Sequence, residues 1–309
     1  MSTEPVKPMP PDLPAPPPTG WKDIFLGDDG LRAGWRLAIY AAIALLLFVP
    51  LSTLAFLILS KAGVPLSSSN VTPALILAQE TASILATLVA VIAMMRIERR
   101  PFDSYGLPLR SAFAGNFWRG ALWGLLMIVG AVLAIAVAAG VSFNGIQLHG
   151  WRLLSQASLW ALAFCLVGLW EEFFFRGYAL ATLADGIGFW PAASVLSAVF
   201  GAIHLTNGGE GWTGVPQIFL ISMLFCLTLR RTGSLWFAVG MHAAWDFGET
   251  FIFSSPDSGT FATGTLLRST FHGPRWLTGG DVGPEGSVIG VFVVVLAMLL
   301  FARLYPDRS

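Results

Sequence analysis

The chain has 309 residues, of which 55% are hydrophobic and 12% are charged, and its formal net charge is zero. Soluble domains carry about 25% charged residues, so this composition excludes an ordinary soluble protein and indicates that lipid surrounds much of the chain. The balanced charge gives no indication of a nucleic-acid partner. Residues 1–30 are rich in proline and are predicted to form a disordered cytoplasmic tail, followed by a membrane domain over residues 31–309.

A helix needs about 20 predominantly apolar residues to cross a bilayer. The sequence therefore predicts an all-α, polytopic membrane bundle of about eight transmembrane helices, at residues 36–59, 73–95, 117–141, 155–184, 189–205, 215–229, 234–253 and 287–304. The fifth and sixth are short, so we expect one of them to be tilted or partly re-entrant. Most Lys and Arg residues lie in the segments that share a side with both termini, which predicts cytoplasmic termini and an outward-facing loop over residues 254–286.

Ionisable residues are rare inside these predicted spans. Each costs at least about 2.5–3.5 kcal/mol to insert, so each marks a candidate functional position. They are Glu80, Glu171, Glu172, Arg176, His204, His242, Asp246 and Glu249. Most of them lie on three of the later spans, and if these spans converge they form a polar site inside the membrane. Glu80 has no sequence neighbour to pair with, and the sequence assigns it no role.

The spacing of these residues predicts specific pairs. Glu172 and Arg176 are four residues apart, so they share a helix face and are expected to form an ion pair. Glu171 is rotated by about 100° from that face, which leaves it for a different partner or for chemistry.

The two histidines have neighbours at the same helical spacing. Phe200 precedes His204 by one turn, and Asp246 follows His242 by one turn. A carboxylate at that distance can orient the imidazole and fix its tautomer.

Two kinds of chemistry fit these groups. In the first, a glutamate acts as a general base on water, one histidine orients that water, and the other stabilises an oxyanion. In the second, Glu171, His204, His242 and Asp246 hold a zinc ion that keeps an open position for water. Either arrangement hydrolyses amides. The chain has no HExxH helix and no Gly-x-Ser-x-Gly elbow, which excludes those two hydrolase classes.

Three sequence motifs resemble those of a known protease family. The stretches EEFFFR (171–176), FGAIH (200–204) and HAAWD (242–246) resemble the EExxxR, FxxxH and HxxxN/D motifs of the CPBP (CAAX-processing and bacteriocin-processing, or Abi) intramembrane proteases. The resemblance covers about residues 151–250. It implies a multi-pass endopeptidase of the cell membrane, similar to the type II CAAX prenyl endopeptidases.

The resemblance also implies roles for single residues. Glu171 would be the general base and His204 would assist it, while His242 and Asp246 would stabilise the oxyanion. Glu172, Arg176 and Phe200 would support them. Asp246 departs from the family pattern, because eukaryotic CAAX proteases usually have Asn there. An ionised Asp is a poor oxyanion donor, so Asp246 must be protonated, orient His242 or contact a metal.

The cofactor and the substrate are expectations at this stage. The family resemblance favours a site that requires no cofactor, with zinc as the alternative. The expected partners are the lipid bilayer and a peptide or membrane-protein substrate, with or without a prenyl group. The sequence gives neither the cleavage site nor the oligomeric state.

Two functions of other classes compete with the protease. A proton-coupled transporter would use Glu80, Glu171 and His204 as relay groups, but the sequence has no obvious duplicated halves. A non-catalytic scaffold of the same fold would bind a lipidated peptide without cutting it, yet it would not need to bear the insertion cost of the Glu and His residues. The protease hypothesis requires Glu171, His204 and His242 to lie within about 12 Å of one another.

Overall fold

The computed structural model describes residues 24–27, 30–67, 70–207 and 214–307. The predicted proline-rich tail lies mostly outside these residues. The helices are α2 (Ala33–Lys61), α3 (Pro73–Glu98), α4 (Gly115–Val137), α5 (Gly150–Glu172), α6 (Leu180–Ile187), α7 (Phe189–His204), α8 (Val215–Thr232), α9 (Trp236–Asp246), α10 (Arg275–Thr278) and α11 (Val288–Leu304). Two π-helical segments are η3 (Phe173–Ala179) and η4 (Phe247–Ile252), and three 3₁₀ turns are η1 (Phe102–Tyr105), η2 (Leu109–Ser111) and η5 (Pro284–Gly286).

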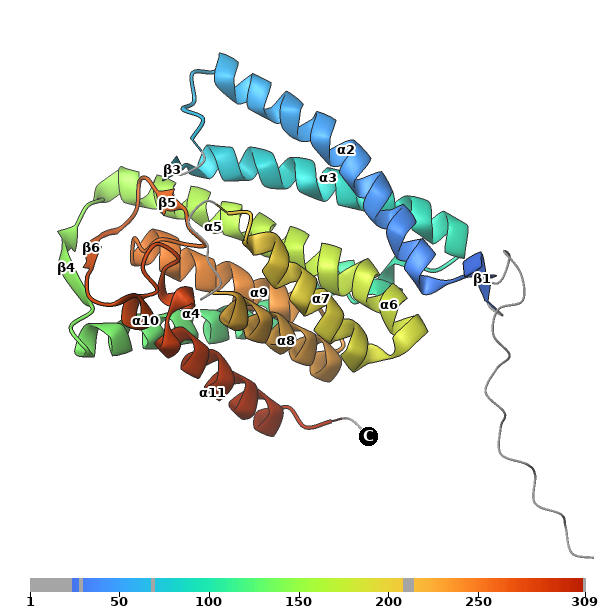
Figure 1. Ribbon diagram of the computed structural model, residues 1–309. Coiled ribbons are helices and arrows are strands. Elements are labelled where there is room, and N and C mark those ends of the chain that lie inside the picture. Colours follow the sequence, from blue (N-terminus) through green and yellow to red (C-terminus); the bar gives the residue numbers. More distant parts are fainter. Residues whose placement is uncertain (1–23, 28–29, 68–69, 208–213, 308–309) are drawn as a thin grey trace, which may run out of the picture.

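The helices form one bundle with α9 at its centre. Helix α9 packs against α4, α5 and α8, and α11 lies against α4 and α8. Helices α2 and α3 run side by side along one face of the bundle, and α5, η3 and α6 form one long continuous rod beneath them (Figure 1). This arrangement confirms the all-α prediction and places the segment with His242 and Asp246 deepest in the protein.

Each of the eight predicted spans falls on a helix, and the fourth continues past Arg176 through η3 as expected. Five helical segments of the described chain are long and apolar enough to cross a membrane, which are Ala33–Lys61, Pro73–Glu98, Gly115–Val137, Gly150–Ile187 and Val215–Thr232. The helices Phe189–His204 and Val288–Leu304 are apolar but shorter. The count of eight and the side of the termini therefore stay predictions, while the multi-pass character is established.

Local signals explain several of the helix ends. Helix α3 begins at Pro73, whose missing N–H suits the first turn, and the Thr72 hydroxyl caps it by accepting a hydrogen bond from the Leu75 N–H. Ser287 caps α11 in the same way through the Gly290 N–H. Helix α8 ends at Gly233, which adopts the left-handed conformation that glycine tolerates best.

Short strands form in two places where the sequence predicts none, at the end of the third span and in the outer loop. Helix α4 ends at Val137 and not near residue 141, because β4 (Val141–Ile146) pairs antiparallel with β6 (Leu267–Phe271). The predicted outer loop of residues 254–286 is thereby folded back onto the bundle. Two smaller pairs join β1 (Leu26–Gly27) to β2 (Gly30–Leu31) and β3 (Asn70–Val71) to β5 (Phe261–Ala262). Pairing between segments so distant in sequence has no local signal.

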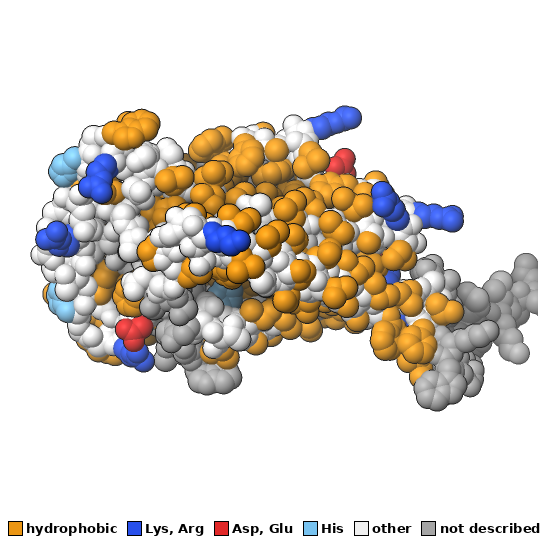
Figure 2. Space-filling view, turned by 90° about the horizontal axis from the view of Figure 1, so that it is seen from above, with side chains coloured by type: hydrophobic (Ala, Val, Ile, Leu, Met, Phe, Trp, Pro, Cys, Tyr) orange, Lys and Arg blue, Asp and Glu red, His pale blue; other side chains and the backbone are white. Residues whose placement is uncertain are grey.

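The surface agrees with a lipid environment. Large apolar side chains are exposed along the outer helices, with Leu46 of α2 at 76% and Phe292 of α11 at 65% exposure. In Figure 2, hydrophobic side chains cover the middle of the molecule and the charged ones lie mainly towards its two ends. Apolar groups that face outward in a bundle of this kind are solvated by lipid chains.

Glycines allow α4 and α9 to approach closely. A Cβ atom at Gly120 would lie 2.0 Å from the Phe237 carbonyl oxygen, and one at Gly124 would lie 2.0 Å from the Met241 carbonyl oxygen. On the other side of the contact, a Cβ at Gly240 would lie 2.0 Å from the Phe117 carbonyl oxygen. Small residues at such positions let membrane helices pack backbone to backbone. The contact fixes the position of α9 and hence of His242.

Candidate active site

Two helices change from α to π geometry directly after a buried carboxylate. Helix α5 ends at Glu172 and continues as η3, while α9 ends at Asp246 and continues as η4. A π turn widens the helix locally and redirects the side chains that follow it, and such turns are frequent at functional sites. The periodicity of the sequence gives no sign of either π segment.

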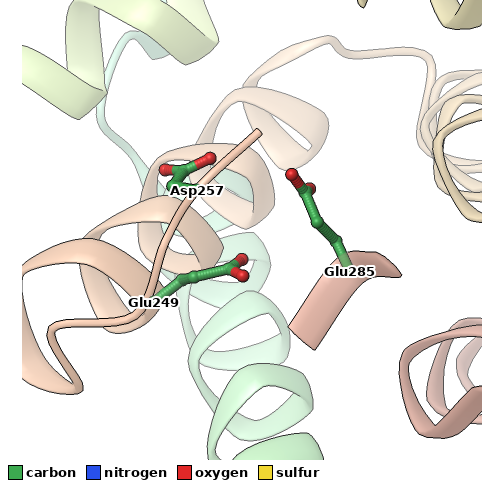
Figure 3. A group of neighbouring side chains, drawn as sticks. All are labelled: Glu249, Asp257 and Glu285. Atoms are coloured by element: carbon green, nitrogen blue, oxygen red, sulfur yellow. The ribbon is translucent and has the colours of Figure 1, made fainter. Parts of the chain in front are cut away.

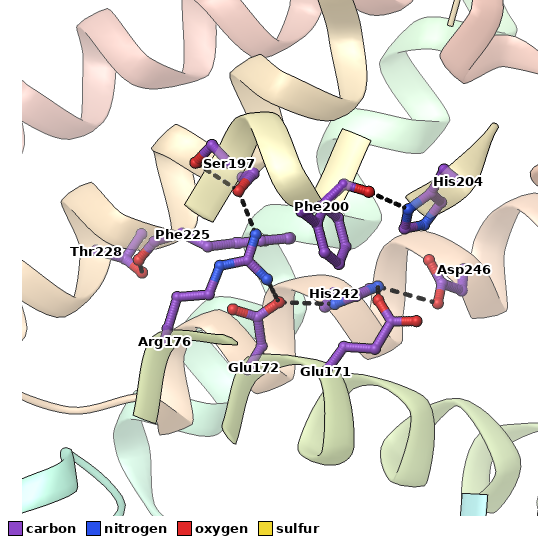
Figure 4. Close-up of polar contacts among 11 residues, drawn as sticks. Glu171, Glu172, Arg176, Ser197, Phe200, His204, Phe225, Thr228, His242 and Asp246 are labelled. Carbon is purple, nitrogen blue, oxygen red and sulfur yellow. Dashed lines mark hydrogen bonds and ion pairs between the residues drawn. The ribbon is translucent and has the colours of Figure 1, made fainter. Parts of the chain in front are cut away.

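Glu172 and Arg176 form the predicted ion pair, with 3.1 Å between Arg176 Nη1 and Glu172 Oε1. Both side chains are almost completely buried. Arg176 also donates a hydrogen bond to Ser222 Oγ, and Ser222 donates in turn to Ser197 Oγ at 2.7 Å. The guanidinium carbon lies 4.4 Å from the centre of the Phe200 ring, at a distance typical of a cation–π contact. Arg176, which lies on η3, is therefore held by residues of α5, α7 and α8 together (Figure 4).

His242 joins this pair to the second glutamate. Its Nδ1 lies 2.9 Å from Glu172 Oε1, and its Nε2 lies 3.7 Å from Glu171 Oε2 and 3.5 Å from Asp246 Oδ2. The ring stacks on Phe225 with 5.2 Å between ring centres. Figure 4 shows His242 between the two glutamates of α5 and the aspartate of its own helix. The adjacent carboxylates thus have different partners: Glu172 contacts Arg176 and Nδ1, and Glu171 faces Nε2.

The hydrogen positions on His242 follow from these partners. Glu172 is paired with an arginine and is therefore a carboxylate, so it accepts a hydrogen bond from Nδ1–H. Nε2 then faces two further carboxyl groups, Glu171 and Asp246. A lone pair directed at two carboxylates is unfavourable, so one proton must lie on Nε2 or on one of these two acids. The site therefore holds a proton among His242 Nε2, Glu171 and Asp246.

His204 is fixed by its own helix. Its Nδ1 lies 2.8 Å from the Phe200 carbonyl oxygen, which can only accept, so Nδ1 carries the hydrogen and the neutral ring keeps Nε2 as its acceptor. The ring also packs against Phe200 with 4.4 Å between ring centres. Phe200 therefore lies between His204 and Arg176.

Two cavities meet at these residues. One, of about 350 Å³, is lined by Glu171, His204, His242 and Asp246 together with Glu80, Asp257 and Glu285. The other, of about 460 Å³, is mainly apolar and runs between α2, α3, η3 and α7. Glu171, Phe200 and His204 line both cavities. The polar cavity also explains the position of Glu80, whose carboxylate projects from α3 towards the same space.

The polar cavity extends to the loop after η4. Asp257 Oδ2 accepts a hydrogen bond of 2.7 Å from the Thr250 hydroxyl. Burial raises the pKa of the Asp257 carboxyl above its ordinary value, because removal from water disfavours the charged form, and the Thr250 hydrogen bond opposes this effect. The sequence predicts only that this loop faces outward, and it assigns no site residue to it.

The alternative of a zinc site depends on how close the possible ligand atoms of the four predicted residues lie to one another. Within the described chain, no three of Glu171, His204, His242 and Asp246 bring ligand atoms within 4.8 Å of one another. A zinc ion binds nitrogen and oxygen at about 2.0–2.2 Å, so three ligands of one ion lie closer together than that. The residues as placed do not fit a zinc ion, and no chemical step is assigned to one.

Several residues of the site escaped sequence analysis. Ser197 and Ser222 form a buried hydroxyl chain to Arg176, and Phe225 stacks on His242. The sequence offered only a serine inside each of two apolar helices, α7, which carries the second motif, and α8, which follows it. The bond from Glu172 to His242 was also missed, because it joins two spans whose packing the sequence does not reveal.

Comparison with known proteins supports the resemblance seen in the motifs. Residues 151–248 match the model of one protein family, described as type II CAAX prenyl endopeptidase Rce1-like. The match begins within α5 and ends in η4, so it contains all three motifs and the whole polar cluster around His242. A search among curated proteins found no match. At the level of the family, the comparison supports a membrane protease of the CAAX type.

Proposed function

We propose that this multi-pass protein, whose residues 151–248 match the Rce1-like family of CAAX proteases, hydrolyses a peptide bond of a membrane-associated or lipidated substrate without a metal ion. The observation that carries the proposal is the division of labour between two adjacent glutamates. Glu172 is completely buried and paired with Arg176, whereas Glu171 is 17% exposed and lines both cavities. One acid is structural and the other meets the space where water and substrate would enter.

Glu171 is proposed to be the general base that removes a proton from the attacking water and then gives it to the amine nitrogen that leaves as the peptide C–N bond breaks. General acid–base catalysis by a positioned side chain contributes about 10²–10⁴-fold to a rate. Its partner is His204, which lines the same cavities and whose Nε2 is the acceptor of the ring. A water between these two acceptors would donate one hydrogen to each, which directs its lone pair at a carbonyl carbon in the cavity.

His242 and Asp246 are proposed to stabilise the oxyanion. The proton required between His242 Nε2, Glu171 and Asp246 gives the site a hydrogen-bond donor at the polar end of the cavity. Preorganised donors of this kind are worth about 10²–10³ in rate each. Glu172 and Arg176 then act as positioning residues, because they hold Nδ1 of His242 and so direct its Nε2.

The apolar cavity supports a substrate with a lipid or apolar segment. Its walls include Ala44, Phe48 and Phe174, and it reaches the catalytic pair through Phe200. A lipid or apolar segment of the substrate lying in this cavity would place the adjacent peptide bond beside Glu171. The proposed location is the cell membrane, where such a substrate is also anchored.

The proposal is tested with the purified full-length protein in detergent. Fluorogenic peptides with and without a prenylated cysteine are incubated with wild type, Glu171→Ala, His204→Ala and an Asp281→Asn control, which alters an exposed residue 60% accessible to solvent. We expect wild type and the control to cleave, and the two site variants to lose cleavage by at least about 100-fold. Wild-type cleavage that survives in both site variants would remove this site as the catalyst.

A second set of reactions tests whether cleavage requires a metal ion. The same reactions are run with 1,10-phenanthroline, which binds zinc, and we expect no change in rate. Abolition by phenanthroline and recovery on adding zinc would contradict the metal-free mechanism while leaving the protease assignment intact.

A further inference from the structure

A second group of carboxylates lies apart from the motifs, at the end of the bundle where η4 meets the loop of residues 254–286. It consists of Glu249 on η4, Asp257 in the loop that follows, and Glu285 on η5. One oxygen from each lies within 4.8 Å of the other two. Figure 3 shows the three side chains pointing towards one another from three separate segments.

The surroundings orient two of these carboxylates. Asp257 accepts a hydrogen bond from the Thr250 hydroxyl at 2.7 Å, and Glu285 Oε1 accepts from the Ser258 N–H at 2.7 Å and the Ser258 hydroxyl at 2.6 Å. These contacts fix the directions of the two side chains. Neither Thr250 nor Ser258 brings a positive charge.

Glu249 is the independent sign of a ligand. Its side chain has no solvent exposure, and neither carboxylate oxygen has a hydrogen-bond partner in the described part of the chain. The indole N–H of Trp245 lies beside it without completing a hydrogen bond. An isolated buried carboxylate is strongly unfavourable unless it is paired, protonated or bound to a metal. The Glu249 carboxylate also faces two other carboxyl groups, and repulsion between their negative charges would destabilise the cluster further unless a cation lies among them.

A glycine keeps the space around Glu249 narrow and lined by oxygen. Gly283 has a φ of +95°, and a Cβ there would lie 2.6 Å from Glu249 Oε1 and 2.1 Å from the Pro256 carbonyl oxygen. The backbone carbonyl and the carboxylate therefore border the same small volume. Backbone carbonyl and carboxylate oxygens are the ligands that Ca²⁺ takes, at about 2.3–2.6 Å each.

We propose that Glu249, Asp257 and Glu285 bind a calcium ion that fastens the loop of residues 254–286 to the end of the helix carrying His242 and Asp246. Oxygens on opposite sides of one Ca²⁺ are separated by about 4.6–5.2 Å, so the spacing of the three carboxylates fits. The set contains oxygen ligands alone, which disfavours zinc and copper. Mg²⁺ is less suitable because it keeps its own waters and demands a tight octahedron.

Such an ion would hold one wall of the polar cavity in place. Asp257 and Glu285 line that cavity together with Glu171 and His242. Binding would fix this wall, and release of the ion would leave three carboxylates to repel one another. The inference does not depend on the proposed peptidase activity, since it concerns binding and stability of the protein alone.

The experiment measures binding directly. The purified protein is treated with EGTA in detergent and titrated with Tb³⁺, a luminescent substitute for Ca²⁺ that is excited through nearby tryptophan, here Trp245. We expect saturable luminescence that Ca²⁺ displaces and Mg²⁺ displaces at least tenfold less effectively, and a Tm that rises with Ca²⁺. Trp245→Phe should lower the luminescence while the Tm response to Ca²⁺ persists.

Two variants and a control complete the design. Glu249→Gln and Asp257→Asn should each reduce the Tb³⁺ signal at least tenfold and abolish the Tm response to Ca²⁺. Asp281→Asn should retain both, because Asp281 is an exposed acid of the same loop that pairs with Arg275. No saturable Tb³⁺ signal and no Tm response in wild type up to about 10 mM Ca²⁺, ten times the weakest affinity usual for extracellular sites, would overturn the inference. A response that survives in Glu249→Gln would also overturn it.

Discussion

His242 Nδ1 lies 2.9 Å from Glu172 Oε1, the same oxygen that Arg176 contacts at 3.1 Å. One carboxylate oxygen therefore connects the first and third motifs of the site. Because Arg176 donates a hydrogen bond to Glu172, and Glu172 accepts the Nδ1 hydrogen of His242, the ring is oriented with Nε2 towards Glu171 and Asp246. The ion pair expected from the sequence thus has a second task, which is to set the direction of a histidine from another helix.

Glu171→Gln separates catalysis from stability. Glutamine keeps the size of the side chain but cannot take a proton from water, so we expect peptide cleavage to fall by about 10²–10⁴-fold. Glu171 has no ion pair with Arg176 and is 17% exposed, so Tm should stay within a few degrees of wild type. Parallel cleavage assays and thermal unfolding of the purified protein check both parts. A variant that retains full cleavage would exclude Glu171 as the base.

Glu172→Gln should behave in the opposite way. The substitution leaves Arg176 buried without its carboxylate, and removing one partner of a buried pair costs about 3–5 kcal/mol. We expect a clear fall in Tm and, because His242 loses its orienting partner, a lower kcat as well. A matched control is Ser222→Ala, which removes only one neutral partner of Arg176 and should lower Tm less. An unchanged Tm in Glu172→Gln would show that the pair does not stabilise the fold.

The close contact of α4 and α9 provides a test away from the site. A Cβ at Gly124 would lie 2.0 Å from the Met241 carbonyl oxygen, directly before His242 in the chain. Gly124→Ala should push the helices apart, destabilise the protein by about 1–3 kcal/mol and reduce cleavage. Gly130→Ala on the same helix is the control, since nothing lies within 4 Å of its Cβ position. Equal Tm values for the two variants would contradict the close packing.

The sequence predicted those features that depend on one helix. The apolar segments placed all eight helical regions, and spacing of four residues identified the Glu172–Arg176 pair. Rarity of charge in apolar surroundings pointed to His204, His242 and Glu171, all of which line one cavity. The roles of these residues in catalysis stay proposals, as does the absence of a required metal.

Features that join distant segments were not predictable. The hydrogen bond between Glu172 and His242 depends on how α5 packs on α9. Glycines such as Gly168 allow this close packing, but they do not show in the sequence which helix packs there. The loop of residues 254–286 brings β6 to β4 and brings Asp257 and Glu285 to Glu249. Its sequence is rich in Gly and Ser and is locally typical of an ordinary connecting loop. The π segments have no periodic signature because they are only seven and six residues long.

Asp246→Asn decides what the third motif contributes. The CAAX protease motif that this segment resembles usually has Asn at this position, and an amide can always donate a hydrogen bond to an oxyanion. Asp246 is buried beside His242 Nε2, where a protonated carboxyl would serve the same purpose. If donation is its role, Asp246→Asn should retain cleavage within about tenfold of wild type, whereas Asp246→Ala should lose about 10²–10³-fold. Cleavage rates for the two variants, measured with equal amounts of folded protein, distinguish the roles. Asn and Ala variants that are equally inactive would mean that the negative charge of Asp246 is needed to orient or charge His242, and the oxyanion donor would then be His242 alone.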